Sequence, residues 1–317
     1  MRTNLGLVVK NCGSTYLVKT DSGETIECMV KGNFRLKGIK STSPVAVGDR
    51  VELAEPTLPG APVFIKNIGE RRNYIIRRSS NLSKQSHILA ANVDLCLLVV
   101  TLKDPETSTV FIDRFLASAQ AYRIPVIIVF NKIDLLDSEG LSNLDQLCGV
   151  YNRIGYETIL CSVRQLRGIE RIKSVLSGNI TLLAGNSGVG KSSLANAILP
   201  GLNLKTGEIS DKHNTGMHTT TFSEMYQFDC DGGWIIDTPG VKGFGVFDMD
   251  KYELPHYFPE MFELSSQCRY GDCSHTNEPG CAVLEAIRQG DIAVSRYESY
   301  LSILEEFEQS KYRESER

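Results

Sequence analysis

The sequence predicts a chain of three domains: a small N-terminal β-barrel of the OB type, a central α/β domain with a glycine-rich loop, and a C-terminal α-helical domain with a cysteine and histidine cluster. Three observations support this fold class. The first 75 residues are short alternating runs, a Gly-x4-Gly-Lys-Ser motif follows an apolar run, and three cysteines and a histidine lie within 14 residues near the C-terminus. We place the domains at residues 1–75, 80–245 and 246–317.

The N-terminal domain is predicted from five strand-like runs separated by turn signals, at residues 5–9, 14–20, 24–30, 47–53 and 63–68. Five short strands are typical of an OB barrel, which binds oligonucleotides on one face and its loops. The connections between the strands are basic (Lys31, Arg35, Lys37, Lys40). A barrel used only for packing is the alternative. We expect a basic linker at residues 71–80, before the central domain starts near Ile88.

Charge is unevenly distributed along the chain. The 317 residues carry a net charge of −4, yet residues 1–80 hold 13 Lys and Arg against 7 Asp and Glu. A basic module on an acidic chain favours a local nucleic-acid surface, although solvated basic faces are common. The sequence shows no apolar run of membrane-spanning length and no signal peptide, and its nine cysteines are scattered, some in apolar strands (Cys96, Cys161). We therefore expect a reduced, cytoplasmic protein.

The glycine-rich loop has the context of a phosphate-binding P-loop. It lies between an apolar, strand-like run at residues 180–184 and a helix expected at residues 193–199. Backbone N–H groups of such a loop surround the β-phosphate at the positive end of the helix. Lys191 would reach the β- and γ-phosphates, and the Ser192 hydroxyl would hold Mg²⁺. The predicted nucleotide-binding residues are Gly185, Asn186, Ser187, Gly188, Val189, Gly190, Lys191, Ser192 and Ser193.

The tetrapeptide Asn131-Lys132-Ile133-Asp134 follows a second buried strand at residues 125–130 and indicates guanine. Asp134 can accept hydrogen bonds from guanine N1–H and N2–H₂, a pattern that adenine does not supply. Asn131 would bond toward the base edge and the P-loop, and the stem of Lys132 would lie over the ring. A later strand leads to Ser162 and Val163, whose backbone we expect to contact the guanine oxygen. The expected ligands are therefore GTP and GDP.

Two segments after the P-loop helix are expected to contact Mg²⁺ and the γ-phosphate. A threonine in residues 206–221 can ligate the metal only while the γ-phosphate is present, and both Thr219 and Thr220 are candidates. Asp237 would hold the metal through water, and the Gly240 N–H would contact the γ-phosphate. Val241 follows, where Ras-like enzymes carry the glutamine that orients water, so intrinsic turnover should be slow.

The order of these motifs is rotated relative to an ordinary GTPase. There the guanine motif follows the P-loop, whereas here Asp134 lies 51 positions before Gly185. The full set of loops is present, as if the domain had been cut after Gly240 and its old ends joined. We therefore predict a circularly permuted GTPase domain, whose γ-phosphate loop leads directly into the C-terminal domain.

The C-terminal cluster has the pattern Cys268-x4-Cys273-x-His275-x5-Cys281, in a stretch rich in Gly, Pro and Ser. Three thiolates and one imidazole predict a closed, tetrahedral and therefore structural Zn²⁺ site. Free thiols are the alternative, but such a loop has little apolar core to fold it without a metal. Residues 282–317 are expected to be helical.

The motifs follow one another in this order: the barrel, the permuted guanine motif and P-loop, Gly216-Met-His-Thr-Thr-Thr, Asp237-Thr-Pro-Gly and the Cys/Cys/His/Cys site. With these motifs in this order, the chain resembles the RsgA (YjeQ/YloQ) family over essentially its whole length. These proteins are circularly permuted GTPases of late small ribosomal subunit maturation. The resemblance implies that the barrel and the zinc domain contact ribosomal RNA and that the small subunit stimulates GTP hydrolysis. It implies no DNA or membrane partner and a monomer. Met217 departs from the family, since many members carry a polar or basic residue there.

The sequence offers more than one candidate for the catalytic group. We hypothesise that His218, or Thr219 or Thr220 beside it, is brought over the γ-phosphate when the segment docks on the ribosome; a solvated His218 without a chemical role is the alternative. Two kinds of protein fit these motifs: a GTP-hydrolysing assembly factor released on hydrolysis, and a nucleotide-gated RNA-binding module in which occupancy alone acts. A GTPase that serves RNA modification or translation directly is a third, less supported reading.

Overall fold

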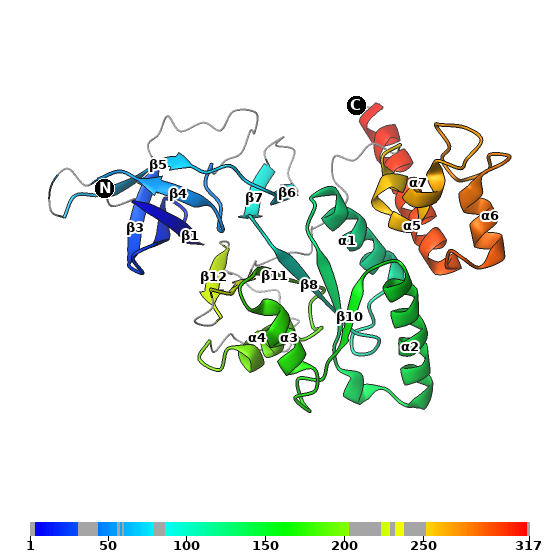
Figure 1. Ribbon diagram of the computed structural model, residues 1–317, viewed down its shortest axis with the longest axis horizontal. Helices are drawn as coiled ribbons and strands as arrows, with labels where there is room; N and C mark the ends of the chain where they lie inside the picture. Colours follow the sequence, from blue (N-terminus) through cyan, green and yellow to red (C-terminus); the bar gives the residue numbers. More distant parts are fainter. Residues whose placement is uncertain are drawn as a thin grey trace.

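The computed structural model describes residues 4–30, 44–55, 58, 60–78, 86–202, 223–228, 232–237 and 252–315. An N-terminal barrel lies at one end of the molecule, a central α/β unit in the middle, and a group of C-terminal helices at the other end (Figure 1). Among these residues, no helix is long and apolar enough to cross a bilayer.

The N-terminal barrel is built from β1 (Leu5–Asn11), β2 (Thr15–Thr20), β3 (Thr25–Val30), β4 (Arg50–Leu53) and β5 (Val63–Ile68). The strand order is β1-β2-β3-β5-β4, and β4 pairs back onto β1 to close the barrel. Its interior includes Val18, Cys28 and Ile65, all buried. The structure thus confirms the predicted five-stranded barrel. The basic connection with Lys31, Arg35, Lys37 and Lys40 lies outside the described residues.

The predicted linker at residues 71–80 is wrong for residues 74–78, which form a strand. β6 (Tyr74–Arg78) pairs with β7 (Ser86–Ala91) in an antiparallel, two-stranded sheet. Ile75 is buried in the core of the central unit, and the guanidinium of Arg71 forms a buried ion pair with Asp49 of the barrel at 2.7 Å. The segment's basic composition suggested a solvated linker, but one of its arginines is a buried structural contact.

The central sheet contains β8 (Leu95–Val100), β9 (Val126–Phe130), β10 (Glu157–Leu160), β11 (Ile180–Ala184) and β13 (Trp234–Asp237). These strands are parallel, in the order β10-β9-β8-β11-β13. β12 (Glu224–Gln227) is antiparallel to β13 and also pairs with β1, so one sheet continues from the central unit into the barrel. An ion pair of 3.0 Å between Lys10 and Glu224 adds to this junction.

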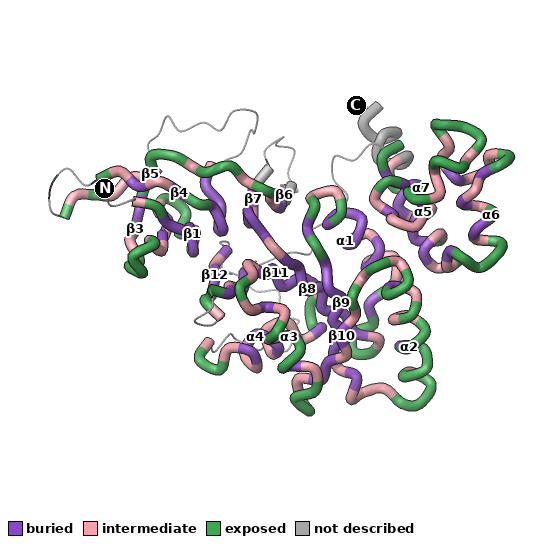
Figure 2. Tube along the Cα trace, in the orientation of Figure 1, coloured by how far each residue is buried: buried purple, intermediate pink, exposed green. Residues whose placement is uncertain are grey.

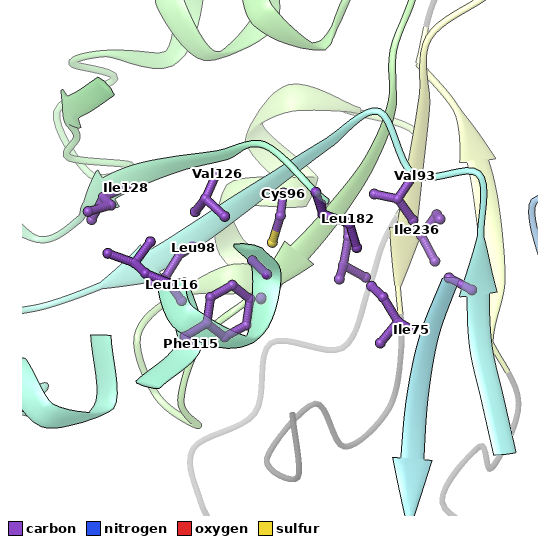
Figure 3. Packing of buried hydrophobic residues seen from close by; sticks show 14 of the residues in the cluster. Ile75, Val93, Cys96, Leu98, Phe115, Leu116, Val126, Ile128, Leu182 and Ile236 are labelled. Carbon is purple, nitrogen blue, oxygen red and sulfur yellow. The ribbon is translucent and has the colours of Figure 1, made fainter. Parts of the chain in front are cut away.

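Helices cover both faces of the central sheet. α1 (Thr109–Ala121) and α2 (Ser138–Arg153) pack on one face, while α3 (Ile169–Leu176) and α4 (Lys191–Ile198) pack on the other. β8 is buried along its whole length, as its continuous apolar sequence predicts, and its side chains alternate between the two cores. Figure 3 shows Phe115 and Leu116 of α1 against the β8 side chains Cys96 and Leu98.

The C-terminal unit consists of η3 (Leu254–Tyr257), α5 (Pro259–Ser265), α6 (Ala282–Gln289) and α7 (Val294–Ser315). Its core contains Phe258, Met261 and Tyr300, together with Ala117 of α1. Figure 2 shows this buried interior next to α1. The helical unit therefore packs directly on the central domain.

Candidate nucleotide-binding site and metal cluster

The sheet topology brings the two rotated motifs together. β9 and β11 both pair with β8, and all three strands run parallel, so their carboxyl ends lie at the same edge of the sheet. Asn131 leaves β9 and the P-loop leaves β11 at this edge. The Asn131 side-chain amide donates a 2.8 Å hydrogen bond to the Val189 carbonyl, which is the P-loop contact expected from the sequence. Crevices at the carboxyl ends of parallel strands are where α/β proteins bind ligands.

The backbone of the P-loop requires glycine at defined positions. Gly185 has φ 136°, and a Cβ atom there would lie 2.1 Å from the Val99 carbonyl oxygen. Gly190 has φ 96°, and a Cβ atom there would lie 2.5 Å from the Asn131 amide nitrogen. The loop therefore passes close to β8 and the guanine motif only because both positions lack a side chain.

The P-loop ends at helix α4, whose first residue is Lys191. The Lys191 ammonium group lies within the loop and donates hydrogen bonds to the carbonyls of Gly185 at 2.8 Å and Asn186 at 2.6 Å. Ser192 and Ser193 occupy the first turn of α4 and are half-buried. A lysine in the first turn of a helix that follows a glycine-rich loop is the arrangement that binds a polyphosphate.

The guanine-recognition residues are linked by side-chain hydrogen bonds. The Ser162 hydroxyl, which is buried, donates to the Asp134 carboxylate at 2.6 Å and accepts from the Gln165 N–H at 3.1 Å. From the sequence, only the backbone of Ser162 is expected to contact guanine; the signal for this side-chain contact is a hydroxyl after the next parallel strand. The Ser162 N–H donates to the Arg167 carbonyl, so Val163 is the candidate for the predicted backbone contact with guanine.

Lys132 is the N-cap of the short helix η1 (Ile133–Leu135) and has a positive φ of 59°. Its ammonium group donates a hydrogen bond to the carbonyl of Asp104 in the loop between β8 and α1. The base of that loop is closed by a 2.8 Å hydrogen bond from the Thr107 N–H to the Thr101 carbonyl. The loop therefore holds the far end of the Lys132 side chain.

Several residues that are predicted to contact the γ-phosphate and Mg²⁺ are not among those that the structure describes. His218, Thr219, Thr220 and Gly240 lie outside the described residues. Asp237 ends β13, whose residues Trp234 to Ile236 pair with Ile180 to Leu182 of the P-loop strand; the Asp237 side chain is also outside the described set. The strand register thus places the Asp237 backbone at the same edge of the sheet as the P-loop.

The predicted metal ligands come together in the C-terminal unit. One ligand atom each from Cys268, Cys273, His275 and Cys281 lies within 4.8 Å of all the others. The Cys268 and Cys281 sulfurs are 3.9 Å apart, and His275 Nδ1 lies 3.7 Å and 3.4 Å from these two sulfurs. Tetrahedral zinc with ordinary bond lengths gives about 3.8 Å between sulfurs and about 3.6 Å between sulfur and nitrogen. The donor set and its spacing therefore fit Zn²⁺.

Hydrogen bonds from outside the cluster hold the loop that carries the ligands. The Glu278 carboxylate accepts hydrogen bonds from the N–H groups of Ser274 at 2.7 Å and Thr276 at 2.9 Å. Burial alone would raise the pKa of Glu278, but these hydrogen bonds and one from the Ser274 hydroxyl lower it to about 2. The hydroxyls of Tyr297 and Tyr300 donate to the carbonyls of His275 and Ser274, at 2.9 Å and 2.7 Å. Helix α7 therefore supports the ligand loop from behind.

Burial lowers the pKa of His275, which favours the neutral imidazole that a metal requires. Cys281 also caps helix α6, since its sulfur accepts a hydrogen bond from the Leu284 N–H at 3.4 Å. Both ligands are thus fixed by the fold around the cluster as well as by the cluster itself.

Comparison with known proteins gives matches over nearly the whole chain. The family described as RsgA GTPase matches residues 68–247, and the RsgA N-terminal domain matches residues 5–57. The "Small ribosomal subunit biogenesis GTPase RsgA 2" of Bacteroides thetaiotaomicron is 61% identical over 308 residues, covering 97% of this chain and 98% of the relative. The "Small ribosomal subunit biogenesis GTPase RsgA" of Porphyromonas gingivalis is 59% identical over 310 residues, with coverage of 97% and 98%.

Two solved structures are similar over nearly their full lengths. The crystal structure of YjeQ from Thermotoga maritima has a TM-score of 0.78 and 38% identity, covering 96% of this chain and 98% of that one. YloQ, described as a circularly permuted GTPase, has a TM-score of 0.75 and 29% identity, with coverage of 98% and 96%. At this coverage, both matches extend over the barrel, the central unit and the C-terminal helices of this chain.

Proposed function

The chain belongs to the RsgA family of GTPases, and on this premise we propose that it binds the small ribosomal subunit and assists or checks its late maturation. The subunit stimulates GTP hydrolysis, and hydrolysis drives release of the protein. The observation that carries this proposal is the rotated guanine motif and P-loop, joined by the Asn131–Val189 hydrogen bond, between a barrel and a Cys₃His cluster. The relatives named above are themselves named for small ribosomal subunit biogenesis.

The nucleotide would lie across the carboxyl edge of the central sheet. Asp134, oriented by the Ser162 hydroxyl, accepts hydrogen bonds from the guanine edge, and Lys132 lies over the base. Lys191 releases the two carbonyls it contacts and binds the β- and γ-phosphates instead. Mg²⁺, held by Ser192 and by Thr219 or Thr220, with Asp237 acting through water, would neutralise phosphate charge. Gly240 completes the γ-phosphate contacts.

The other two units bind the partner. The barrel, with basic connections, contacts ribosomal RNA, and the C-terminal unit, held by one structural Zn²⁺, contacts the subunit near it. We retain domain limits of 1–75, 80–245 and 246–317, a cytoplasmic location and a monomeric state as parts of this proposal. The continuous sheet through β12 and β1 connects the barrel to β13, the strand that ends at Asp237.

The first test is steady-state GTP hydrolysis with and without purified small ribosomal subunits. We expect slow turnover alone and an increase of about 10³-fold or more with small subunits, because an apolar Val241 cannot orient the attacking water and a partner must complete the site.

Large ribosomal subunits serve as the control and should give no increase. GTP-dependent binding to the small subunit without faster hydrolysis would instead support the nucleotide-gated RNA-binding module. Neither binding nor stimulation would show that the partner is misassigned.

We expect His218→Ala to lower the subunit-stimulated rate by about 10²-fold, the scale of a lost proton-transferring or water-positioning group. Intrinsic hydrolysis and GDP affinity should not change, since His218 acts only when the subunit docks. His213→Ala is the matched control, because it removes a histidine from the same segment. Full stimulation of the His218 variant would exclude a catalytic role for His218.

A further inference from the structure

A buried ionic cluster joins the C-terminal helices to the central domain. Arg296 of α7 is 2% exposed, and Asp113 of α1 is fully buried. The Arg296 guanidinium donates to the Asp113 carboxylate at 2.7 Å and forms two hydrogen bonds to Glu260 of α5, at 2.7 Å and 3.1 Å. It also lies 4.5 Å from the centre of the Phe258 ring.

The cluster has partners on both sides of the junction. The hydrogen bonds from Tyr151 and Arg296 to Asp113 both go to the same oxygen, Oδ1, while its buried Oδ2 accepts none from the residues that the structure describes. The Tyr151 hydroxyl of α2 donates a 2.9 Å hydrogen bond to Asp113. The neighbouring acids raise the pKa of Arg296, although burial alone would lower it, so this side chain remains charged. A buried charge of this kind is a poor source of stability by itself, because desolvation cancels much of the attraction. Arg296 nevertheless keeps its contacts with both Asp113 of α1 and Glu260 of α5 only if these helices hold one relative position.

The position fixed here is that of helix α1, which starts next to the nucleotide site. Asp113 lies one turn after the Ser108 N-cap, and the loop of residues 101–107 ends at that cap. The Asp104 carbonyl of this loop accepts the hydrogen bond from Lys132 of the guanine motif. A continuous series of contacts thus runs from Arg296 through Asp113, α1 and the loop to the residue over the base.

We propose that Arg296 is a positioning residue for guanine binding, supplied to the nucleotide site by the C-terminal helical domain. It holds α1, and thereby the Asp104 carbonyl, where Lys132 can lie extended over the base. The inference rests on the proposed guanine site. A lysine that is already held in its bound position loses less conformational freedom when the nucleotide binds.

The decisive experiment measures the dissociation constant of fluorescent GDP in a double-mutant cycle of Arg296→Met and Lys132→Met, at a temperature where all variants are folded. Arg296→Met keeps an unbranched apolar stem and removes the guanidinium group with its charge. We expect it to weaken GDP binding about tenfold in the wild-type background and to have little effect in the Lys132→Met background. Arg296→Lys, which keeps the charge but loses the forked contact, should be intermediate.

Glu306→Gln is the matched control. It breaks an exposed ion pair with Arg114 between the same two helices, so it should leave GDP affinity unchanged. If Arg296→Met does not fold, Asp113→Asn, which keeps the shape of the carboxylate, replaces it in the cycle.

Two outcomes overturn the inference: additive effects of the two substitutions, or a lower melting temperature with unchanged GDP affinity, which would show a structural role alone. A wild-type protein that does not bind GDP would overturn the proposed nucleotide site instead. The failure of the inference and that of the proposed function are therefore distinguishable.

Discussion

Cys281→Ser is expected to abolish stoichiometric zinc binding and to unfold the C-terminal domain. Residues 266–281 contain neither helix nor strand, so this loop has no secondary structure to hold it when the metal is lost. Apparent zinc-binding free energies of about 10–16 kcal/mol in small zinc domains are largely folding free energy. Cys281 is also the N-cap of α6, a role that serine can fill, so this substitution removes the metal ligand alone. We expect bound zinc to fall from one per chain to nearly none.

Zinc content and hydrogen exchange over residues 254–307 measure this effect. Tyr297 and Tyr300 should lose their hydrogen bonds to the ligand loop, so backbone protection in α7 should fall as well. Cys12→Ser is the control, since Cys12 is an exposed cysteine of the barrel and should leave both readouts unchanged. Full zinc content and full protection in the Cys281 variant would contradict a structural metal site.

The parts of the site that could be predicted from sequence are those whose residues are neighbours along the chain. The P-loop requires glycine at Gly185 because the backbone there passes within contact distance of Val99. The glycine spacing of the motif shows this requirement in the sequence itself. The four metal ligands lie within 14 residues, and the barrel strands alternate in hydrophobicity over their own length. In each case, residues that are close together in the sequence determine most of the local structure.

The parts that could not be predicted depend on contacts between distant segments. Arg296 and Asp113 are 183 positions apart, and each by itself resembles an ordinary charged residue on a helix. Ser162 contacts Asp134 because β10 pairs with β9 in the sheet, a pairing that the sequence does not show. The sequence places Arg71 in a basic linker, and its buried partner Asp49 lies in a different segment of the chain, so the ion pair has no local signal. Burial converts each of these from a solvated group to a structural one, and burial is a property of the fold.

Asp134→Asn is expected to change the base that the site prefers. The carboxylate offers acceptors to both guanine N–H groups, whereas an amide replaces one acceptor with a donor. Hydrogen bonds to a charged group contribute about 1.5–3 kcal/mol each, so GDP affinity should fall by about 10²- to 10⁴-fold. Xanthosine diphosphate carries a carbonyl in place of the 2-amino group, and the new donor matches it. The variant should therefore bind xanthosine diphosphate more tightly than GDP, as competition titrations against a fluorescent nucleotide would measure.

Because of the contact with Ser162, we expect Asp134→Asn to alter recognition of the base without altering the fold. Its hydroxyl can still donate to the oxygen of the new amide, so the side chain keeps its orientation and the fold keeps its stability. Asp137→Asn is the matched control: Asp137 caps α2 through the Gly140 N–H at 2.8 Å, and asparagine caps helices equally well. That control should retain the wild-type preference for GDP. If both variants prefer GDP to the same extent, Asp134 does not contact the guanine edge, and the rotated motif has another role in this protein.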